Sequence, residues 1–135
     1  MTDLRPDEGY SLITNHIKIT VVPEYLTEHS DPKNNVYAFS YNVTIENLGS
    51  DTVQLINRHW IVFSGGIQFA DVKGEGVIGL QPVLNPGDSF QYGSGSTIDD
   101  VHGSMHGTYT FQNENGEFFD VKIPRFDLIC LDIVN

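Results

Sequence analysis

The chain has 135 residues, of which 39% are hydrophobic and 11% aromatic, and its formal net charge is −11. This size and composition fit one globular domain over 1–135 with a core of its own, and we expect 1–9 to be a flexible tail. The negative charge repels phosphate backbones and argues against a nucleic-acid binder.

The N-terminal segment does not have the pattern of a signal peptide. The first ten residues lack the apolar core of a signal peptide, and no apolar run approaches the length of a membrane span, so we expect a cytoplasmic protein. The single cysteine, Cys130, excludes a disulfide within the chain and a zinc site built from thiolates. Its apolar surroundings predict a buried thiol.

Alternation of apolar and polar residues predicts strands through most of the chain. It is clearest over 37–45, where every second residue is aromatic or β-branched. The run 53–63 is apolar on both faces, which predicts a central strand with Leu55 and His59 on one face and Arg58 and Trp60 on the other. Strands are expected at 16–21, 37–45, 53–63, 67–72, 76–80, 89–92, 107–112, 117–123 and 126–131.

Clusters of glycine, asparagine and proline predict turns at 47–51, 64–66, 85–88 and 113–116. No segment has helical periodicity with caps, so the pattern predicts an all-β sandwich. Two polar stretches, 27–35 and 94–106, are expected to be loops. Long loops in compact domains are often functional, so Ser94, Gly95 and Met105 are candidates for a partner-binding surface.

The ordered series of motifs from 10 to 128 resembles the ApaG family. It includes 39–47, the triplet 58–60, the glycine run 74–79, the turn 86–87 and the segments 103–109 and 121–128. The resemblance implies an immunoglobulin-like or fibronectin type III-like β-sandwich of two antiparallel sheets. It also implies a non-enzymatic module with a protein partner, associated with cobalt tolerance and magnesium transport.

Gly74, Gly76 and Gly79 match the dinucleotide-binding fingerprint in letters, but two prolines follow too closely for the helix that this motif requires. Two interpretations stay open. The glycines shape a bulge or a close strand crossing. Alternatively, their amides form an anion nest that, with Arg58, binds pyrophosphate or a dinucleoside polyphosphate. The second interpretation agrees with a polyphosphate hydrolase encoded beside family members.

Asp99, His102 and His106 are candidate ligands for a divalent cation, because imidazole and carboxylate suit ions such as cobalt. Their spacing matches no known motif, and a solvated polar loop is the alternative. Magnesium would need clustered carboxylates.

No catalytic motif is recognised, so no catalytic residue is predicted. We therefore expect a binding module, monomeric or paired into a homodimer through a sheet edge. A sensor of small anions or divalent cations is the alternative, and an undescribed polyphosphate hydrolase is a third.

Overall fold

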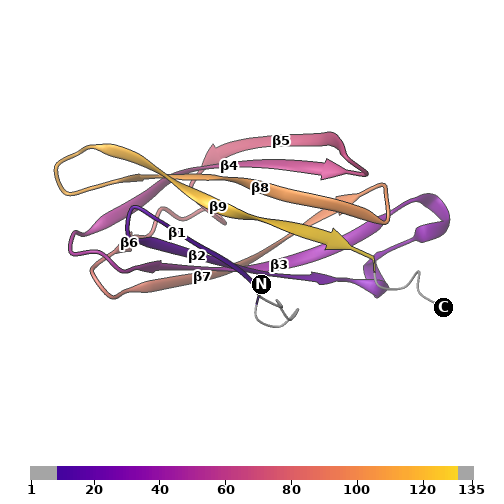
Figure 1. Cartoon of the computed structure of the whole chain (residues 1–135), viewed down its shortest axis with the longest axis horizontal. Helices are drawn as coiled ribbons and strands as arrows, with labels where there is room; N and C mark the ends of the chain where they lie inside the picture. Colours follow the sequence, from indigo (N-terminus) through magenta and orange to yellow (C-terminus); the bar gives the residue numbers. More distant parts are fainter. Residues whose placement is uncertain (1–8, 131–135) are drawn as a thin grey trace, which may run out of the picture.

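The structure is a computed structural model that describes residues 9–130 (Figure 1). Within this range there are nine strands and two short 3₁₀ turns, and no α-helix. No helix of the described part is long and apolar enough to cross a membrane. The elements are β1 (Tyr10–Thr14), β2 (Ile17–Tyr25), η1 (Thr27–His29), η2 (Pro32–Asn34), β3 (Tyr37–Asn47), β4 (Val53–Ser64), β5 (Ile67–Glu75), β6 (Val83–Leu84), β7 (Ser89–Ile98), β8 (His102–Gln112) and β9 (Phe118–Ile129).

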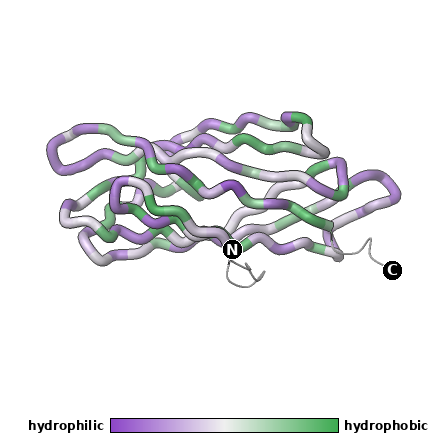
Figure 2. Tube along the Cα trace, viewed as in Figure 1, coloured by the Kyte–Doolittle hydropathy of each residue, from purple (hydrophilic) through white to green (hydrophobic). Residues whose placement is uncertain are grey.

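The strands form two antiparallel sheets that pack face to face, which confirms the predicted sandwich. One sheet has the order β1-β2-β3-β7; the other has the order β5-β4-β8-β9, and β6 pairs with β4. Hydrophobic and hydrophilic residues alternate along the strands (Figure 2). The inward residues of β3, such as Val43 and Ile45, are fully buried between the sheets.

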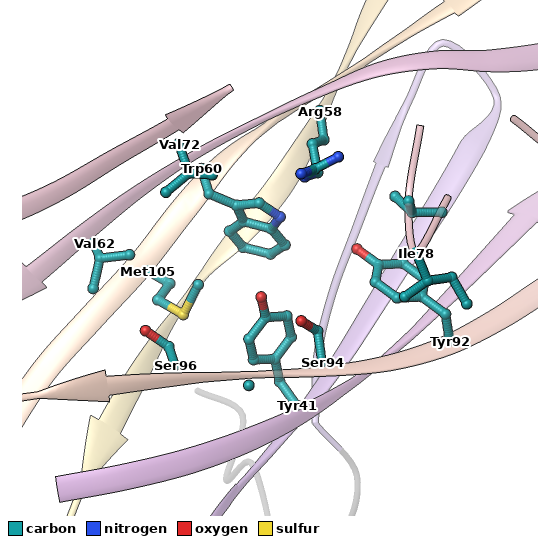
Figure 3. A pocket seen from close by; sticks show the side chains of 12 residues that line it. Tyr41, Arg58, Trp60, Val62, Val72, Ile78, Tyr92, Ser94, Ser96 and Met105 are labelled. Atoms are coloured by element: carbon teal, nitrogen blue, oxygen red, sulfur yellow. The ribbon is translucent and has the colours of Figure 1, made fainter. Parts of the chain in front are cut away.

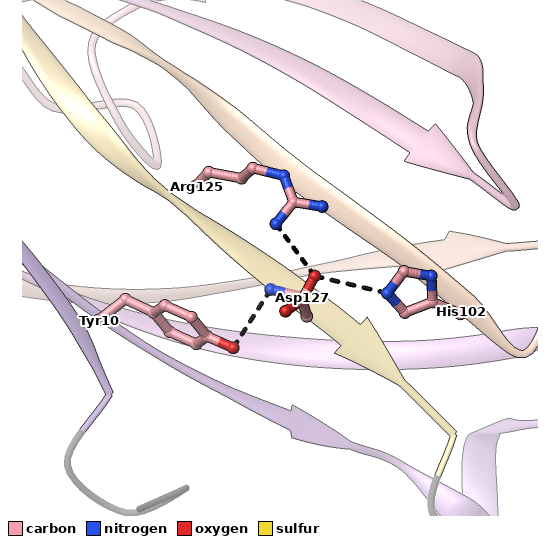
Figure 4. A network of polar contacts seen from close by, with 4 residues as sticks. All are labelled: Tyr10, His102, Arg125 and Asp127. Atoms are coloured by element: carbon pink, nitrogen blue, oxygen red, sulfur yellow. Dashed lines mark hydrogen bonds and ion pairs between the residues drawn. The ribbon is translucent and has the colours of Figure 1, made fainter. Parts of the chain in front are cut away.

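One long side of the sandwich is closed by contacts between β1 and β9. The ring of Tyr10 lies 6.1 Å from that of Phe126, and its hydroxyl accepts a hydrogen bond from the Asp127 amide at 3.4 Å (Figure 4). The Asn15 side chain donates to the Asp120 carbonyl at 3.1 Å. On the opposite side, β7 and β5 end their sheets and each pairs on one flank only in the described chain. This second side is therefore open.

A β-bulge in β4 corrects the predicted faces of this strand. The register with β8 shifts between Leu55 and Asn57, which leaves Ile56 as an extra residue. Leu55 and Trp60 consequently both face the core, with 0% and 4% of their surface exposed, although alternation placed them on opposite faces. A bulge changes the face of the sheet to which every following side chain of the strand points, and no local sequence pattern predicts it.

The prediction of a loop over 94–106 is wrong. Strands β7 and β8 run through most of it, and the chain reverses only between Ile98 and His102. Alternation predicts β7 only over 89–92, because Gly93, Ser94 and Gly95 contribute no apolar alternation. Tertiary pairing with β3 decides their conformation.

Other differences concern short or proline-containing segments. Residues 76–80 form a turn with one isolated bridge between Val77 and Leu80, in place of the expected strand. β1 and β6 were not predicted. β9 passes through Pro124 as one strand, because its register with β8 shifts between Met105 and Gly107 and Pro124 lies at this bulge of an edge strand, where proline is tolerated.

The predictions for the chain ends are tested only in part. Residues 1–8 of the expected tail, and residue 131 of the last expected strand, lie outside the described residues. Gly9 is buried, and a Cβ there would lie 2.5 Å from the Val21 carbonyl oxygen. The predicted burial of Cys130 is confirmed, with 1% of its surface exposed.

Candidate functional site

The open side of the sandwich contains a cleft of about 300 Å³ between the two sheets (Figure 3). β3, β4 and β8 supply its floor, β7 supplies one rim, and the turn after β5 supplies the other. Trp60, Tyr41 and Met105 lie on the floor, and Ser94 and Ile78 lie at the rims. The lining is mainly apolar and carries a few polar groups, which is typical of ligand and peptide sites.

The floor is a packed aromatic cluster centred on Trp60. Its ring lies 5.3 Å from that of Tyr41 and 5.9 Å from that of Phe126, and it meets Tyr109 edge-on at 6.3 Å. The hydroxyls of Tyr92 and Tyr109 form a hydrogen bond of 2.5 Å beneath the cleft. Tilted and edge-on arrangements of this kind are the favoured aromatic pair geometries, so the base of the cleft is closely packed.

Burial raises the pKa of the tyrosine hydroxyls in this cluster further above neutral pH. Burial raises the pKa of Tyr41, and a hydrogen bond with Ser94 and the charge of Arg58 oppose this shift only in part. Burial likewise raises the pKa of Tyr92 and of Tyr109. At neutral pH these groups act as hydrogen-bond donors and acceptors, and the positive charge of the cleft comes from Arg58.

Arg58 joins β4 to the turn that follows β5. Its Nη1 donates hydrogen bonds to the carbonyls of Glu75 and Gly76, each at 3.0 Å. A Cβ at Gly74 would lie 2.8 Å from the guanidinium carbon, so the side chain crosses directly over this glycine. Figure 3 shows the guanidinium group pointing into the cleft that also contains Trp60. Arg58 therefore both holds the turn and supplies the cation of the cleft.

The glycine run shapes a tight turn. Gly76 has a φ of 64°, and a Cβ there would lie 2.2 Å from the Leu80 carbonyl oxygen. The Gly76 amide donates to the Ile56 carbonyl at 2.8 Å, while the amides of Val77 and Leu80 donate to each other's carbonyls at 2.8 and 2.9 Å. These contacts support the interpretation that the glycines allow close backbone approach. The amides of Gly76, Val77 and Leu80 therefore already have partners within the protein and are not available to an anion.

The three candidate cation ligands make separate contacts. The Nε2 atom of His102 lies 3.4 Å from Asp127 on the outer face of the sheet (Figure 4). His106 stacks on an aromatic ring of β4, and Asp99 accepts a hydrogen bond from Ser64 at 2.5 Å. Residues 9–130 contain no group of three or more His, Cys, Asp or Glu side chains that could hold a metal ion. The expected triplet is therefore not gathered into one site.

The structure brings the remaining candidates together. Ser94, Gly95 and Met105 line the same cleft as Arg58, although they lie on two strands and not on the expected loop. Gly74 lies under Arg58, whereas Gly79 is in open space at the outside of the turn. Local patterns in the sequence do not indicate the aromatic floor. Alternation identifies Tyr41 as an inward residue, but no local signal shows that the sheets leave a gap above it.

Comparisons with known proteins agree with this architecture. The family model described as the ApaG domain matches residues 27–113. A protein named Protein ApaG from Dechloromonas aromatica is 45% identical over 117 residues, which cover 85% of this chain and 92% of that protein. A protein of the same name from Mesorhizobium japonicum is 44% identical over 119 residues, which cover 88% of this chain and 92% of that protein.

Two solved structures have the same fold. A crystal structure of a Bordetella pertussis protein described as ApaA superposes with a TM-score of 0.82 at 43% identity, covering 85% of this chain and 94% of that one. An X-ray structure of a structural-genomics target superposes with a TM-score of 0.82 at 37% identity, covering 90% of this chain and 92% of that one.

Proposed function

Because the chain belongs to the ApaG family, we propose that it is a non-enzymatic binding module of the cytoplasm that recognises a protein partner through the cleft. The observation that carries this proposal is the cleft itself: a concave, largely apolar site with a packed aromatic floor on the open side of the sandwich. Sandwich domains commonly bind through such surfaces and through exposed edges.

The lining of the cleft suits a large apolar side chain of a partner. Such a side chain would pack on the rings of Trp60 and Tyr41 and displace water from them. Arg58 and the Ser94 hydroxyl would bond to a backbone carbonyl or a side-chain oxygen next to it. The few polar groups would then orient the partner, and the aromatic floor would supply most of the affinity.

A variant in which a large side chain fills the cleft tests this proposal. Ser94→Trp places an indole over the floor from an exposed position of β7, and Thr97→Trp places the same group on the opposite face of that strand. We expect partners captured from native lysate by the wild-type protein to be retained by Thr97→Trp and lost by Ser94→Trp. Capture of the same partners by the filled cleft would refute the proposal.

The association with cobalt and magnesium homeostasis is, in our proposal, indirect. The described residues gather no group of ligands for a metal ion, so the partner would connect the protein to ion transport. A strain that lacks the protein tests this link through its cobalt tolerance. Complementation by Thr97→Trp but not by Ser94→Trp is the expected result, and equal complementation by both would contradict it.

A second candidate function, a sensor of pyrophosphate or a dinucleoside polyphosphate, is favoured by the position of Arg58 in the cleft. An anion at about 100 times its Kd adds roughly 2.7 kcal/mol of stability. A rise in Tm with pyrophosphate should be absent in Arg58→Met and present in Lys33→Met, which removes an equal charge from η2. No rise in the wild-type protein would exclude this function. The same assay with cobalt tests the version in which a divalent cation is sensed.

A further inference from the structure

The edge strands of the two sheets differ in how they are protected against pairing with another chain. Natural sheets protect their edges with charged side chains, proline, bulges or cover. β5 carries Asp71 and Lys73 and has a register shift opposite β4. β9 carries Pro124 and Arg125 and is covered by β1, which is itself short.

β7 has none of these devices among its ten residues. It contains no charged residue and no proline. Its register with β3 is continuous, from Ser89 opposite Glu46 to Ile98 opposite Tyr37, so no bulge twists it away. Most of its residues are exposed, and Gly93 and Gly95 leave its backbone without covering side chains. It is therefore the edge most open to a further strand in the described chain.

The hydrogen-bonding phase of β7 follows from two contacts at the end of β3. The Asn47 amide donates toward β7, to the Asp88 carbonyl at 3.0 Å, and the Leu48 amide donates toward β2, to the His16 carbonyl at 2.9 Å. Odd-numbered residues of β3 therefore bond to β7, and the register pairs them with even-numbered residues of β7. The even-numbered residues of β7 thus bond to β3. The amides and carbonyls that point away from the sheet belong to Ser89, Gln91, Gly93, Gly95 and Thr97.

Charges at both ends of β7 indicate the kind of partner. Asp88 precedes the strand, and Asp99 and Asp100 follow it. A second copy of this chain would bring these carboxylates, and a net charge of −11, against their equivalents. An extended segment with an uncharged middle and basic ends would instead match the edge.

We propose that β7 accepts an extended segment of a partner protein as an added strand. The segment has an uncharged middle of about the length of β7, lysine or arginine near its ends, and one large apolar side chain. This inference rests on the proposed function, because it takes the partner to be a protein, and it adds how that partner binds. Backbone hydrogen bonds to β7 supply affinity, and the cleft supplies specificity.

The cleft and the edge are suitably placed for one ligand. The side chains of Tyr92, Ser94 and Ser96 face the cleft from β7. In an added strand, every second side chain continues the same face of the sheet. One such side chain therefore lies over the opening of the cleft, beside Ser94 and Ser96, and is the large apolar residue of the proposed segment.

A phage-displayed library of random peptides as long as β7, selected on the wild-type protein, supplies the probe. Amide hydrogen exchange is then measured with an enriched synthetic peptide. We expect slower exchange at Gln91, Gly93, Gly95 and Thr97, and basic residues at the ends of the enriched peptides. Failure to enrich a peptide that protects these amides would overturn the proposal. So would the same protection appearing with rising protein concentration and no peptide, because the occupant would then be a second copy.

Paired variants separate strand addition from occupation of the cleft. Gln91→Pro removes one outward amide without removing a bond to β3, and Gln91→Ala removes the same side chain but keeps the amide. We expect peptide affinity to fall about tenfold or more in Gln91→Pro and to change little in Gln91→Ala. If Gln91→Pro fails to fold, the exchange pattern of the wild-type protein decides the question.

The outcomes for the two proposals are distinguishable. Peptide binding that is lost in Ser94→Trp but unchanged in Gln91→Pro would leave the proposed function in place and overturn strand addition. Binding that is unaffected by either variant would refute both. Loss of binding in both variants is the result that the inference requires.

Discussion

The hydrogen bond between Tyr92 and Tyr109 beneath the cleft gives a prediction with a defined magnitude. Both rings are buried, with 7% and 0% of their surface exposed, and the hydroxyls lie 2.5 Å apart. Tyr92→Phe leaves the buried Tyr109 hydroxyl without this bond, which costs about 1–3 kcal/mol. Each kcal/mol lowers Tm by roughly 4 °C in a domain of this size, so Tm should fall by about 4–12 °C.

The two single variants should differ, and the double variant should recover part of the loss. Tyr92 lines the cleft and Tyr109 does not, so the hydroxyl that remains in Tyr109→Phe lies nearer to water, and this variant should lose less stability. Replacing both tyrosines removes both polar groups and should cost less than the sum of the single losses. Urea unfolding measures all four proteins. Strict additivity, or a loss below about 0.5 kcal/mol in Tyr92→Phe, would refute the reasoning.

Two further predictions concern backbone approach and pH. A Cβ at Gly107 would lie 1.9 Å from the His59 carbonyl oxygen, so Gly107→Ala should lower the free energy of unfolding in urea by at least about 3 kcal/mol. Gly79 lies in open space at a φ of 79°, so Gly79→Ala should lower it by only about 1–2 kcal/mol. Equal losses in the two variants would contradict the geometry. Because burial raises the pKa of the cleft tyrosines in the folded state, unfolding releases their protons at alkaline pH. The contribution of these tyrosines to the free energy of unfolding should therefore be fully present below about pH 10 and be lost as the pH rises above it. A free energy of unfolding that does not change at higher pH would show that these hydroxyls do not titrate on unfolding.

Local patterns in the sequence determined most of the strands and turns of this protein. Alternation over 37–45 is sufficient to predict β3 and its buried face, because side chains of a strand point to opposite sides in turn. Gly65 and Gly66 form the two-residue turn between β4 and β5 with φ of 59° and 86°, as their lack of a Cβ allows. Such features depend on neighbouring residues only, so they can be read without the fold.

Tertiary structure alone decided which candidate residues meet in one site. β7 continues beyond Tyr92 because β3 offers it hydrogen-bonding partners, and its glycines and serines carry no signal of their own. Gly74 and Arg58 meet, and the cleft opens between β7 and the turn after β5, because segments far apart in the chain pack together. These distances follow from how two sheets stack and where their edges end, which are properties of the whole chain and not of any window of it.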